Sequence, residues 1–327
     1  MNPNLLAEVQ FNIGYSLIHR NKFVEAEEFL RKAIDIKPDY AEAYNDLADV
    51  LGQLGKIEES EICLRKSHEL KPDLTVAIWN LYGLSKTIEE AESWILKCLD
   101  NDENFLKAKI TLSALRLHQG DPLLFNELLQ SEHKNHPAVR SIKWVSTLPN
   151  RPELFFNRWD FFDRMIDKCE RSRPFYEFGV WRGVSFKYLK KYFAKGYGFD
   201  TFTGLVEDWY VKKGTYDTDG ISPSIDGGTF IKGEYNETLP SFFSEPRPKA
   251  SLINFDCDTY SSTLCALNNS KSVIDSNTIL IFDEFIVNEE WEQDEYKALN
   301  EFCFNNNLKY EVIAVSYYTL QVAVRLI

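Results

Sequence analysis

Residues 175–183 read FYEFGVWRG, and this stretch determines which fold the second half of the chain can adopt. A short apolar run contains one acid, Glu177, and leads into a turn with two glycines, Gly179 and Gly183, before a segment of helical length. Glycines at such a turn let the backbone approach a ligand closely, with a helix N-terminus beside it. The pattern predicts a β-strand that enters a helix through a ligand-binding turn.

Six further apolar runs follow this one and alternate with stretches of helical length. The seven runs cover residues 175–180, 196–200, 229–233, 251–256, 278–283, 309–315 and 320–326. Strands that alternate with helices form a mostly parallel sheet, which binds ligands at the carboxyl ends of its strands. Three of these strands end in an acid: Asp200, Asp256 and Asp283. We therefore expect an α/β domain with a seven-stranded sheet and a site at this edge.

The first half of the chain contains a repeat. KAIDIKPDYAEAY at residues 32–44 is echoed by KSHELKPDLTVAI at residues 66–78, so Pro38 and Pro72 stand 34 residues apart. A helix-turn-helix unit of this period resembles the tetratricopeptide repeat (TPR). Two repeats are clear and two degenerate ones extend to about residue 139. The resemblance predicts a helical solenoid.

A TPR array usually presents a concave face to a peptide or a protein. By repeat position, that face would include Glu8, Phe11, Tyr15, Asn45, Asp49 and Trp79. The alternative is that the helices only pack against the second domain or against a sister subunit in a homodimer. The sequence does not choose between these roles.

The composition excludes several classes of function. The chain has 327 residues and a formal net charge of −13 at pH 7, so it lacks the broad basic face that binds nucleic acid or an anionic membrane. Apolar runs such as residues 278–282 are too short to span a bilayer, and residues 1–10 do not resemble a signal peptide. The six cysteines form no C-x-x-C pair. We predict a cytoplasmic protein with reduced thiols and no membrane or nucleic-acid partner.

The histidines limit the chemistry of the second half. All five lie at or before His136, so no histidine base or histidine metal ligand is available to the α/β domain. Ser-His-Asp catalysis, Cys-His catalysis and histidine-bound zinc are therefore excluded there.

The glycine turn and the next strand together indicate a cofactor. The second strand ends in Asp200, about twenty residues beyond Glu177, which is the spacing at which an acid holds a nucleoside ribose. The arrangement suits a nicotinamide cofactor or S-adenosylmethionine (SAM). The turn lacks the full G-x-G-x-x-G pattern that cradles a pyrophosphate, and this favours SAM.

Three acids follow the fourth and fifth strands. Asp256, Asp283 and Glu284 would meet at one edge of an open parallel sheet, as oxygen ligands suited to Mg²⁺, Mn²⁺ or Ca²⁺. The alternative is that some of them cap helices or pair with arginine or lysine.

Five segments in this order resemble the macrocin O-methyltransferase (TylF-like) family of class I SAM-dependent methyltransferases. They are EFGVWRGVS at 177–185, YGFDTFTGL at 197–205, ETLP at 237–240, DCDTYSST at 256–263 and FDE at 282–284. The resemblance covers roughly residues 170–327 and implies a Rossmann-like methyltransferase domain at 171–327. A helical linker at 140–170 and a TPR domain at 1–139 would precede it. Members of the family act mainly on hydroxyls of sugars or other natural products, and typically require Mg²⁺.

The resemblance also implies roles for individual residues. Glu177, Gly179 and Gly183 would lie near the methionine part of the cofactor, Asp200 would hold the ribose, and residues 233–235 would lie near the adenine. The full set of residues expected to hold the cofactor is Glu177, Gly179, Gly183, Ser185, Asp200, Thr201, Phe202, Gly233, Glu234, Tyr235 and Asp256. Mg²⁺ or Mn²⁺ would be bound by Asp256, Asp283 and Glu284. The family's general base is a histidine or an aspartate near the first metal ligand, and without a histidine the candidate is Asp258.

A long polar segment, residues 206–228, separates the second and third strands. We interpret it as a lid over an acceptor site, with Trp209 and Tyr210 as candidate contacts and Trp291 as a second wall; a surface loop is the alternative.

Two other functions stay open at this point. The D-x-D at 256–258 also occurs in metal-dependent nucleotide-sugar glycosyltransferases, and the chain could be a TPR scaffold with an inactive methyltransferase domain. The expected acceptor is a hydroxyl on a small molecule or a glycan, and the alternative is a protein or carrier that the TPR region delivers.

Overall fold

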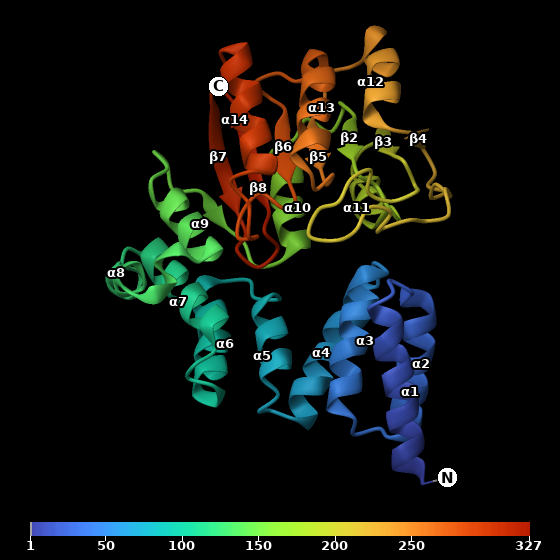
Figure 1. Cartoon of the computed structure of the whole chain (residues 1–327), viewed down its shortest axis with the longest axis vertical. Coiled ribbons are helices and arrows are strands. Elements are labelled where there is room, and N and C mark those ends of the chain that lie inside the picture. The colour runs from blue at the N-terminus through green and yellow to red at the C-terminus, as the bar shows by residue number, and fades with distance from the viewer. Residues whose placement is uncertain (1) are drawn as a thin grey trace. The chain divides into compact units, whose positions relative to one another are not determined.

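The computed structural model describes residues 2–327, which form two compact units (Figure 1). The first unit ends at Leu115 and the second runs from Arg116 to Ile327. The domain boundaries expected from the sequence, at residues 139 and 171, stay a prediction. Within residues 2–327, every helix is too short or too polar to cross a lipid bilayer.

The N-terminal unit consists of helices in antiparallel pairs. They are α1 (Pro3–Ile18), α2 (Phe23–Ile36), α3 (Ala41–Gln53), α4 (Ile57–Leu70), α5 (Thr75–Tyr82), α6 (Ile88–Asn101) and the first part of α7 (Leu106–Gln119). Small buried residues, such as Ala26 and Ala33 on α2, let neighbouring helices approach closely. Ser67 Oγ on α4 donates a 2.8 Å hydrogen bond to the carbonyl of Ala41 at the start of α3. The predicted helical repeats are therefore present.

The residues expected on the concave face of the repeats differ in exposure. Tyr15 is exposed, and Phe11 packs against Tyr40 with ring centroids 5.0 Å apart. Asn45, in contrast, is buried and accepts a 3.1 Å hydrogen bond from Asn80 Nδ2. Asn45 therefore joins α3 to α5, and partner binding by the unit stays a prediction.

Gly14 should be essential to the first helix pair. A Cβ added there would lie 2.8 Å from Leu30 Cγ, so Gly14→Val should destabilise the protein by about 1–3 kcal/mol through overpacking. The control is Gly52→Ala, whose Cβ would meet nothing nearer than Ser60 Oγ at 3.7 Å and should stabilise α3 by about 0.5–1 kcal/mol. Urea unfolding of the full chain, followed by circular dichroism, measures both changes. Equal stability of Gly14→Val and the wild type would contradict this packing.

The C-terminal unit is built on an eight-stranded sheet. The strands are β1 (Glu153–Leu154), β2 (Phe175–Phe178), β3 (Gly196–Asp200), β4 (Gly228–Lys232), β5 (Leu252–Phe255), β6 (Ile279–Phe282), β7 (Tyr310–Val315) and β8 (Val322–Leu326). Their spatial order is β1-β7-β8-β6-β5-β2-β3-β4, and β8 runs antiparallel to both of its neighbours. The sheet is therefore mixed: all its strands are parallel except β8, which runs in the opposite direction.

The sequence predicted seven strands, and the count was low by one. All seven predicted runs contain a strand, and the additional one, β1, lies inside the segment expected to be a helical linker. It consists only of Glu153 and Leu154, so it carries no apolar run that a sequence pattern could reveal. β1 pairs in parallel with β7 and covers what would otherwise be the edge of the sheet.

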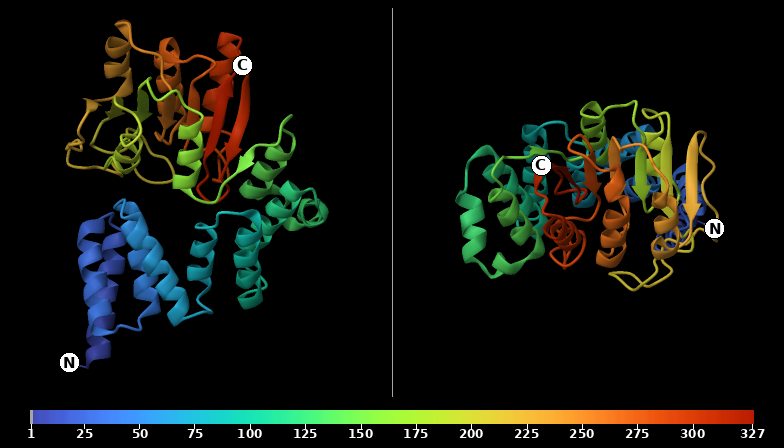
Figure 2. Two further views of the ribbon diagram at one scale, coloured as in Figure 1. Left: turned by 180° about the vertical axis from the view of Figure 1, so that it is seen from behind. Right: turned by 90° about the horizontal axis from the view of Figure 1, so that it is seen from above.

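Helices cover both faces of the sheet (Figure 2). The α-helices that lie wholly in this unit are α8 (Leu123–Gln130), α9 (Pro137–Ser146), α10 (Arg158–Asp167), α11 (Val184–Leu189), α12 (Tyr235–Ser244), α13 (Tyr260–Ser270) and α14 (Glu295–Asn306). The buried residues of α12, α13 and α14 pack with Tyr176 and Phe178 of β2 in one core cluster. Those of α10 and α11 pack with Phe175 in a second cluster. Alternate side chains of each strand thus point to opposite helical layers.

Four phenylalanines form a row across the centre of the sheet. Phe178 stacks on Phe199 and on Phe255, and Phe255 stacks on Phe282, with centroids 4.8, 5.3 and 4.8 Å apart. The same pairs are register partners in the parallel ladders of β3, β2, β5 and β6. Each phenylalanine ends its strand or stands one residue before its end, so the residues that follow also lie side by side.

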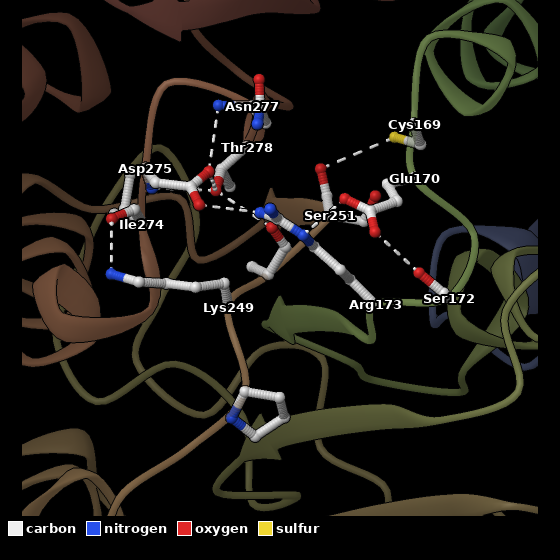
Figure 3. A network of polar contacts seen from close by, with 12 residues as sticks. Cys169, Glu170, Ser172, Arg173, Lys249, Ser251, Ile274, Asp275, Asn277 and Thr278 are labelled. Atoms are coloured by element: carbon white, nitrogen blue, oxygen red, sulfur yellow. Dashed lines mark hydrogen bonds and ion pairs between the residues drawn. The ribbon is translucent and has the colours of Figure 1, made fainter.

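Polar contacts fix the opposite edge of the sheet, at the amino ends of β2, β5 and β6 (Figure 3). Arg173 Nη1 lies 2.8 Å from Asp275 Oδ2, and Thr278 Oγ1 donates a 3.0 Å hydrogen bond to the carbonyl of Ala250. Cys169 Sγ contacts the carbonyl of Ser251 at 3.6 Å. These contacts hold the strand starts and leave the carboxyl ends for ligand binding.

Candidate functional site

The residues that follow the phenylalanine row form the base of the site. They are Gly179, Asp200, Asp256 and Asp283, at the carboxyl ends of β2, β3, β5 and β6. Because side chains alternate along a strand, these residues belong to the face that α10 and α11 cover. The prediction that three strand-end acids share one edge of the sheet is therefore confirmed by the strand order.

Glu177 lies two residues before Gly179 and is fully buried. Its Oε1 accepts hydrogen bonds from Ser185 Oγ at 2.5 Å and from Asn254 Nδ2 at 2.9 Å. Its Oε2 is buried and has no hydrogen-bond partner among residues 2–327. Burial raises the pKa of Glu177 to about 8, although both hydrogen bonds oppose the shift. A buried acceptor of this kind indicates a place for a donor from a ligand.

The glycine turn packs directly on the end of β5. Gly179 has φ +87°, and a Cβ there would lie 1.7 Å from the carbonyl oxygen of Asp256. Gly183 has φ +75°, and its Cβ would lie 2.9 Å from Pro223 Cγ. Both positions therefore require glycine, the first for close approach of β2 to β5 and the second for contact with the segment 206–228.

Asp200 holds the glycine turn in place. Its Oδ2 accepts 2.7 Å hydrogen bonds from the backbone amides of Val180 and Trp181, and its Oδ1 accepts one from the amide of Phe202. The amide of Gly233 donates to the carbonyl of Asp200 at 3.0 Å. The structure thus brings Gly233 beside Asp200, as the predicted ribose and adenine site requires, and the ribose role itself stays a prediction.

The other predicted cofactor residues occupy the same edge. Glu234 precedes α12 as its N-cap, and the Tyr235 hydroxyl lies 3.3 Å from the carbonyl of Phe199. Thr201 Oγ1 donates to the carbonyl of Gly204 at 2.9 Å. Phe202 is fully buried in the cluster of α10 and α11, so its side chain belongs to the core.

Asp258 has the properties of a proton acceptor. It has φ +63°, and its carboxylate makes no hydrogen bond to any part of the chain that the structure describes. Burial raises its pKa to about 7, and the charges of Asp283 and Asp200 add to the shift. A base is most effective when its pKa is near the working pH.

Further acids surround Asp256. Burial raises its pKa well above the usual range, and the charge of Asp283 adds to the shift. Burial and Asp283 likewise raise the pKa of Glu284 to about 8. Glu295 is fully buried, accepts a 3.1 Å hydrogen bond from the amide of Glu284 and has its pKa raised by burial and by Asp283. Several carboxyl groups thus converge, as predicted for Asp256, Asp283 and Glu284.

The arrangement does not fit the predicted divalent cation. Arg158 Nη2 lies 2.5 Å from Asp283 Oδ2, and Gln321 Nε2 donates to Asp283 Oδ1 at 2.6 Å. Both oxygens of one expected ligand therefore already hold protein donors. In the structure of residues 2–327, no group of three His, Cys, Asp or Glu side chains is placed to hold a metal ion. Asp283 therefore pairs with an arginine, which was the alternative to metal binding that the sequence left open. The prediction of a Mg²⁺ site is not supported.

The segment 206–228 reaches the far side of the site. Trp209 Nε1 lies 3.2 Å from Asp294 Oδ2, and the Tyr210 hydroxyl accepts a 2.6 Å hydrogen bond from the amide of Glu290. Because Pro223 also contacts the glycine turn, the segment connects Gly183 with the residues that follow β6. Its role as a lid stays a prediction.

Trp291 contributes to a different hollow. It packs against Trp144 and Tyr296 in the core cluster on the α14 side of the sheet. A pocket of about 600 Å³ beside it is lined by Leu129, Lys134, Asn135, Arg140, Lys143, Trp144, Thr147, Trp291, Glu292 and Tyr296. None of the clustered acids lines this pocket. A role for Trp291 at the acceptor site stays a prediction.

Sequence reasoning missed four residues of the site: Arg158, Asn254, Glu295 and Gln321. The sequence contains a signal for one of them: Asn254 is a polar residue within the apolar run that forms the buried strand β5. In the structure it is the register partner of Glu177. Arg158 and Gln321 lie in no recognisable motif, and only the fold brings them to Asp283.

Comparisons with known proteins found one family model and several solved structures that are similar to parts of this chain. The tetratricopeptide repeat family model matches residues 17–83. This segment is a TPR region. The first TPR of Spaghetti (RPAP3), solved with an HSP90 peptide, is similar at 20% identity, over 36% of this chain and 96% of that chain, with a TM-score of 0.33. No curated protein matches the sequence.

Two solved O-methyltransferases are also similar to the chain. The O-methyltransferase NovP is 15% identical over 51% of this chain and 78% of that chain, with a TM-score of 0.42. The calicheamicin methyltransferase CalS11 is 18% identical over 68% of this chain and 93% of that chain, with a TM-score of 0.41.

Glu177 should make the stability of the protein depend on pH. Its pKa rises from 4.5 to about 8 on folding, so the folded state holds a proton that the unfolded state has lost. Stability should therefore fall as pH rises from 4.5 to 8, by up to about 1.4 kcal/mol per pH unit for this group, and then level off. Glu177→Gln should remove this part of the slope in urea titrations between pH 5 and 8.

The control is Glu153→Gln. The hydrogen bond from Arg164 lowers the pKa of Glu153 despite its partial burial, so this group is ionised in both states throughout the same range. The substitution should shift the stability curve without changing its slope. An unchanged slope in Glu177→Gln would show that Glu177 is ionised in the folded protein.

Proposed function

We propose that the C-terminal unit binds SAM and transfers its methyl group to a hydroxyl of an acceptor molecule. The observation that carries the proposal is the buried, half-paired carboxyl group of Glu177 beside the glycine turn. β2 has β3 on one side and β5 on the other, so the strand order reverses between β2 and β5. Open α/β sheets bind their ligands at the carboxyl end of such a switch point.

The side chains around the turn fit an amino-acid cofactor. Glu177 Oε2 and Asn254 Oδ1 are buried acceptors without a partner among residues 2–327, and they face the same side of neighbouring strands. The amino group on the methionine part of SAM is a charged donor that would satisfy them. When bound, SAM supplies an electrophilic methyl group on its sulfonium.

The same turn is poorly suited to a diphosphate. A pyrophosphate is normally cradled by free backbone amides at a glycine turn. Here the amides of Val180 and Trp181 already donate to Asp200 at 2.7 Å. This favours SAM over a nicotinamide cofactor or a nucleotide sugar, and it argues against the glycosyltransferase alternative.

The protein's own part in the reaction is to position and deprotonate the acceptor. We assign Asp258 as the base, because its carboxylate has no protein partner among residues 2–327 and its pKa is about 7. It would take the proton of the acceptor hydroxyl, while the segment 206–228 shields the site from water. The acceptor class, a sugar or natural-product hydroxyl, follows from the resemblance, and partner binding or dimerisation is proposed for the TPR region.

Calorimetry with S-adenosylhomocysteine, the product form of the cofactor, tests the proposal. We expect it to bind the full chain, with UDP and NAD as non-binding controls. Glu177→Gln should weaken its binding at least tenfold, because a charged hydrogen bond contributes about 1.5–3 kcal/mol. Glu153→Gln, on the distant β1, should bind like the wild type. Binding of UDP without S-adenosylhomocysteine would instead support glycosyl transfer.

Asp258→Asn should separate chemistry from cofactor binding. The variant should keep the affinity for S-adenosylhomocysteine and lose turnover by about 100-fold or more, since the amide cannot accept the proton. Turnover is measured as S-adenosylhomocysteine release with a panel of sugar acceptors. Asp167→Asn, an exposed carboxylate at the end of α10, is the control. Full turnover in Asp258→Asn would remove Asp258 from this role.

A further inference from the structure

We propose that the guanidinium of Arg158 is the resident cation of the acid cluster and takes the place that the sequence assigned to a divalent metal ion. Its role at the acceptor rests on the proposed function; its occupation of the cation position does not. The inference follows from where α10 places Arg158, from its contacts and from the donors that it leaves available.

Arg158 stands at a position that helix energetics alone would not favour. It is the first residue of α10, whose N-cap Asn157 accepts hydrogen bonds from the amides of Trp159 at 2.8 Å and Asp160 at 3.3 Å. A positive side chain is unfavourable near a helix N-terminus, because the helix dipole is positive there. The firm cap fixes the start of α10, and the acids opposite supply the compensating charge.

Arg158 forms an ion pair with Asp283, the most buried of the three acids that were expected to bind a metal ion. Its Nη2 lies 2.5 Å from Oδ2 of Asp283, a side chain only 7% exposed. Gln321 Nε2 donates to the other oxygen at 2.6 Å. A divalent ion bound to Asp283 would have to share an oxygen with one of these donors, and it would lie beside a guanidinium that repels it.

The charge of Arg158 acts on more than Asp283. It opposes the burial that raises the pKa of Asp256, of Glu284 and of Glu177. Burial lowers the pKa of Arg158, but the charges of Asp283, Asp256 and Glu284 raise it by more, and Asp283 contributes most. The guanidinium thus interacts favourably with each of the three acids that Mg²⁺ was expected to bind, Asp256, Asp283 and Glu284. The binding free energy of a second cation at this cluster is therefore less favourable.

Arg158 keeps donors for a ligand. Its side chain is 33% exposed, and Nε and Nη1 make no hydrogen bond to any of residues 2–327. Arginine donates in a fixed fork and does not act as a base at neutral pH. It therefore suits an acceptor with two neighbouring hydroxyl oxygens, holding one while Asp258 deprotonates the other.

Binding of Mn²⁺ to the full-length protein tests the inference without SAM or an acceptor. Free Mn²⁺ is measured by electron paramagnetic resonance at 0.15 M salt. The wild type should bind Mn²⁺ no more tightly than about 1 mM, the weak end of protein cation sites. Arg158→Gln removes the resident charge and should bind one ion at least about tenfold more tightly. Arg158→Lys keeps the charge and should behave like the wild type.

Arg164→Gln is the matched control, because Arg164 lies on the same helix but pairs with Glu153. It should not change Mn²⁺ binding. Tight, stoichiometric binding by the wild type would overturn the inference, even if Arg158→Gln fails to fold. Equal affinity of wild type and a folded Arg158→Gln would also overturn it. S-adenosylhomocysteine binding, measured separately, shows whether the proposed cofactor fails independently of the cation.

Discussion

The site depends on the register of four parallel strands. β3, β2, β5 and β6 are aligned so that four phenylalanines stack in one row on the α12–α14 side. Strand alternation then places the next residue of each strand on the other side, where α10 and α11 lie. A slip of one residue in any of these strands would move its acid into the apolar layer, so the phenylalanine packing that stabilises the core also determines which carboxyl groups meet.

That alignment concentrates negative charge where water is scarce. Burial raises the pKa of Glu177, Asp256, Glu284 and Glu295, and Asp283 adds to the shift of each. Such a cluster is stable only with protons, a cation or a charged ligand to offset the repulsion. Arg158 supplies one positive charge, and the unpaired oxygen of Glu177 leaves a position for another. The same repulsion therefore explains why the site holds an arginine and why it would attract a cofactor with an amino group.

The sequence predicted the parts of this arrangement that depend on local pattern. Strands ending in Asp200, Asp256 and Asp283 could be read because each is an apolar run that stops at an acid. Arg158 could not, since it lies 125 residues from Asp283 and outside every motif. The metal prediction was not supported for the same reason. The sequence shows that acids at the strand ends will meet and will need a counter-charge, but only the folded chain shows which group provides it.

The raised pKa of Glu177 has a consequence for ligand binding. Without a ligand, a carboxyl group with a pKa of about 8 is mostly protonated at neutral pH, and this limits repulsion with its neighbours. An ammonium group placed against Oε2 favours the ionised form, so binding would expel the proton. Affinity for an amino-acid cofactor should then rise with pH until Glu177 is ionised in the free protein. The group that makes the folded chain less stable as pH rises towards 8 is thus the group on which the proposed binding of a positively charged ligand depends.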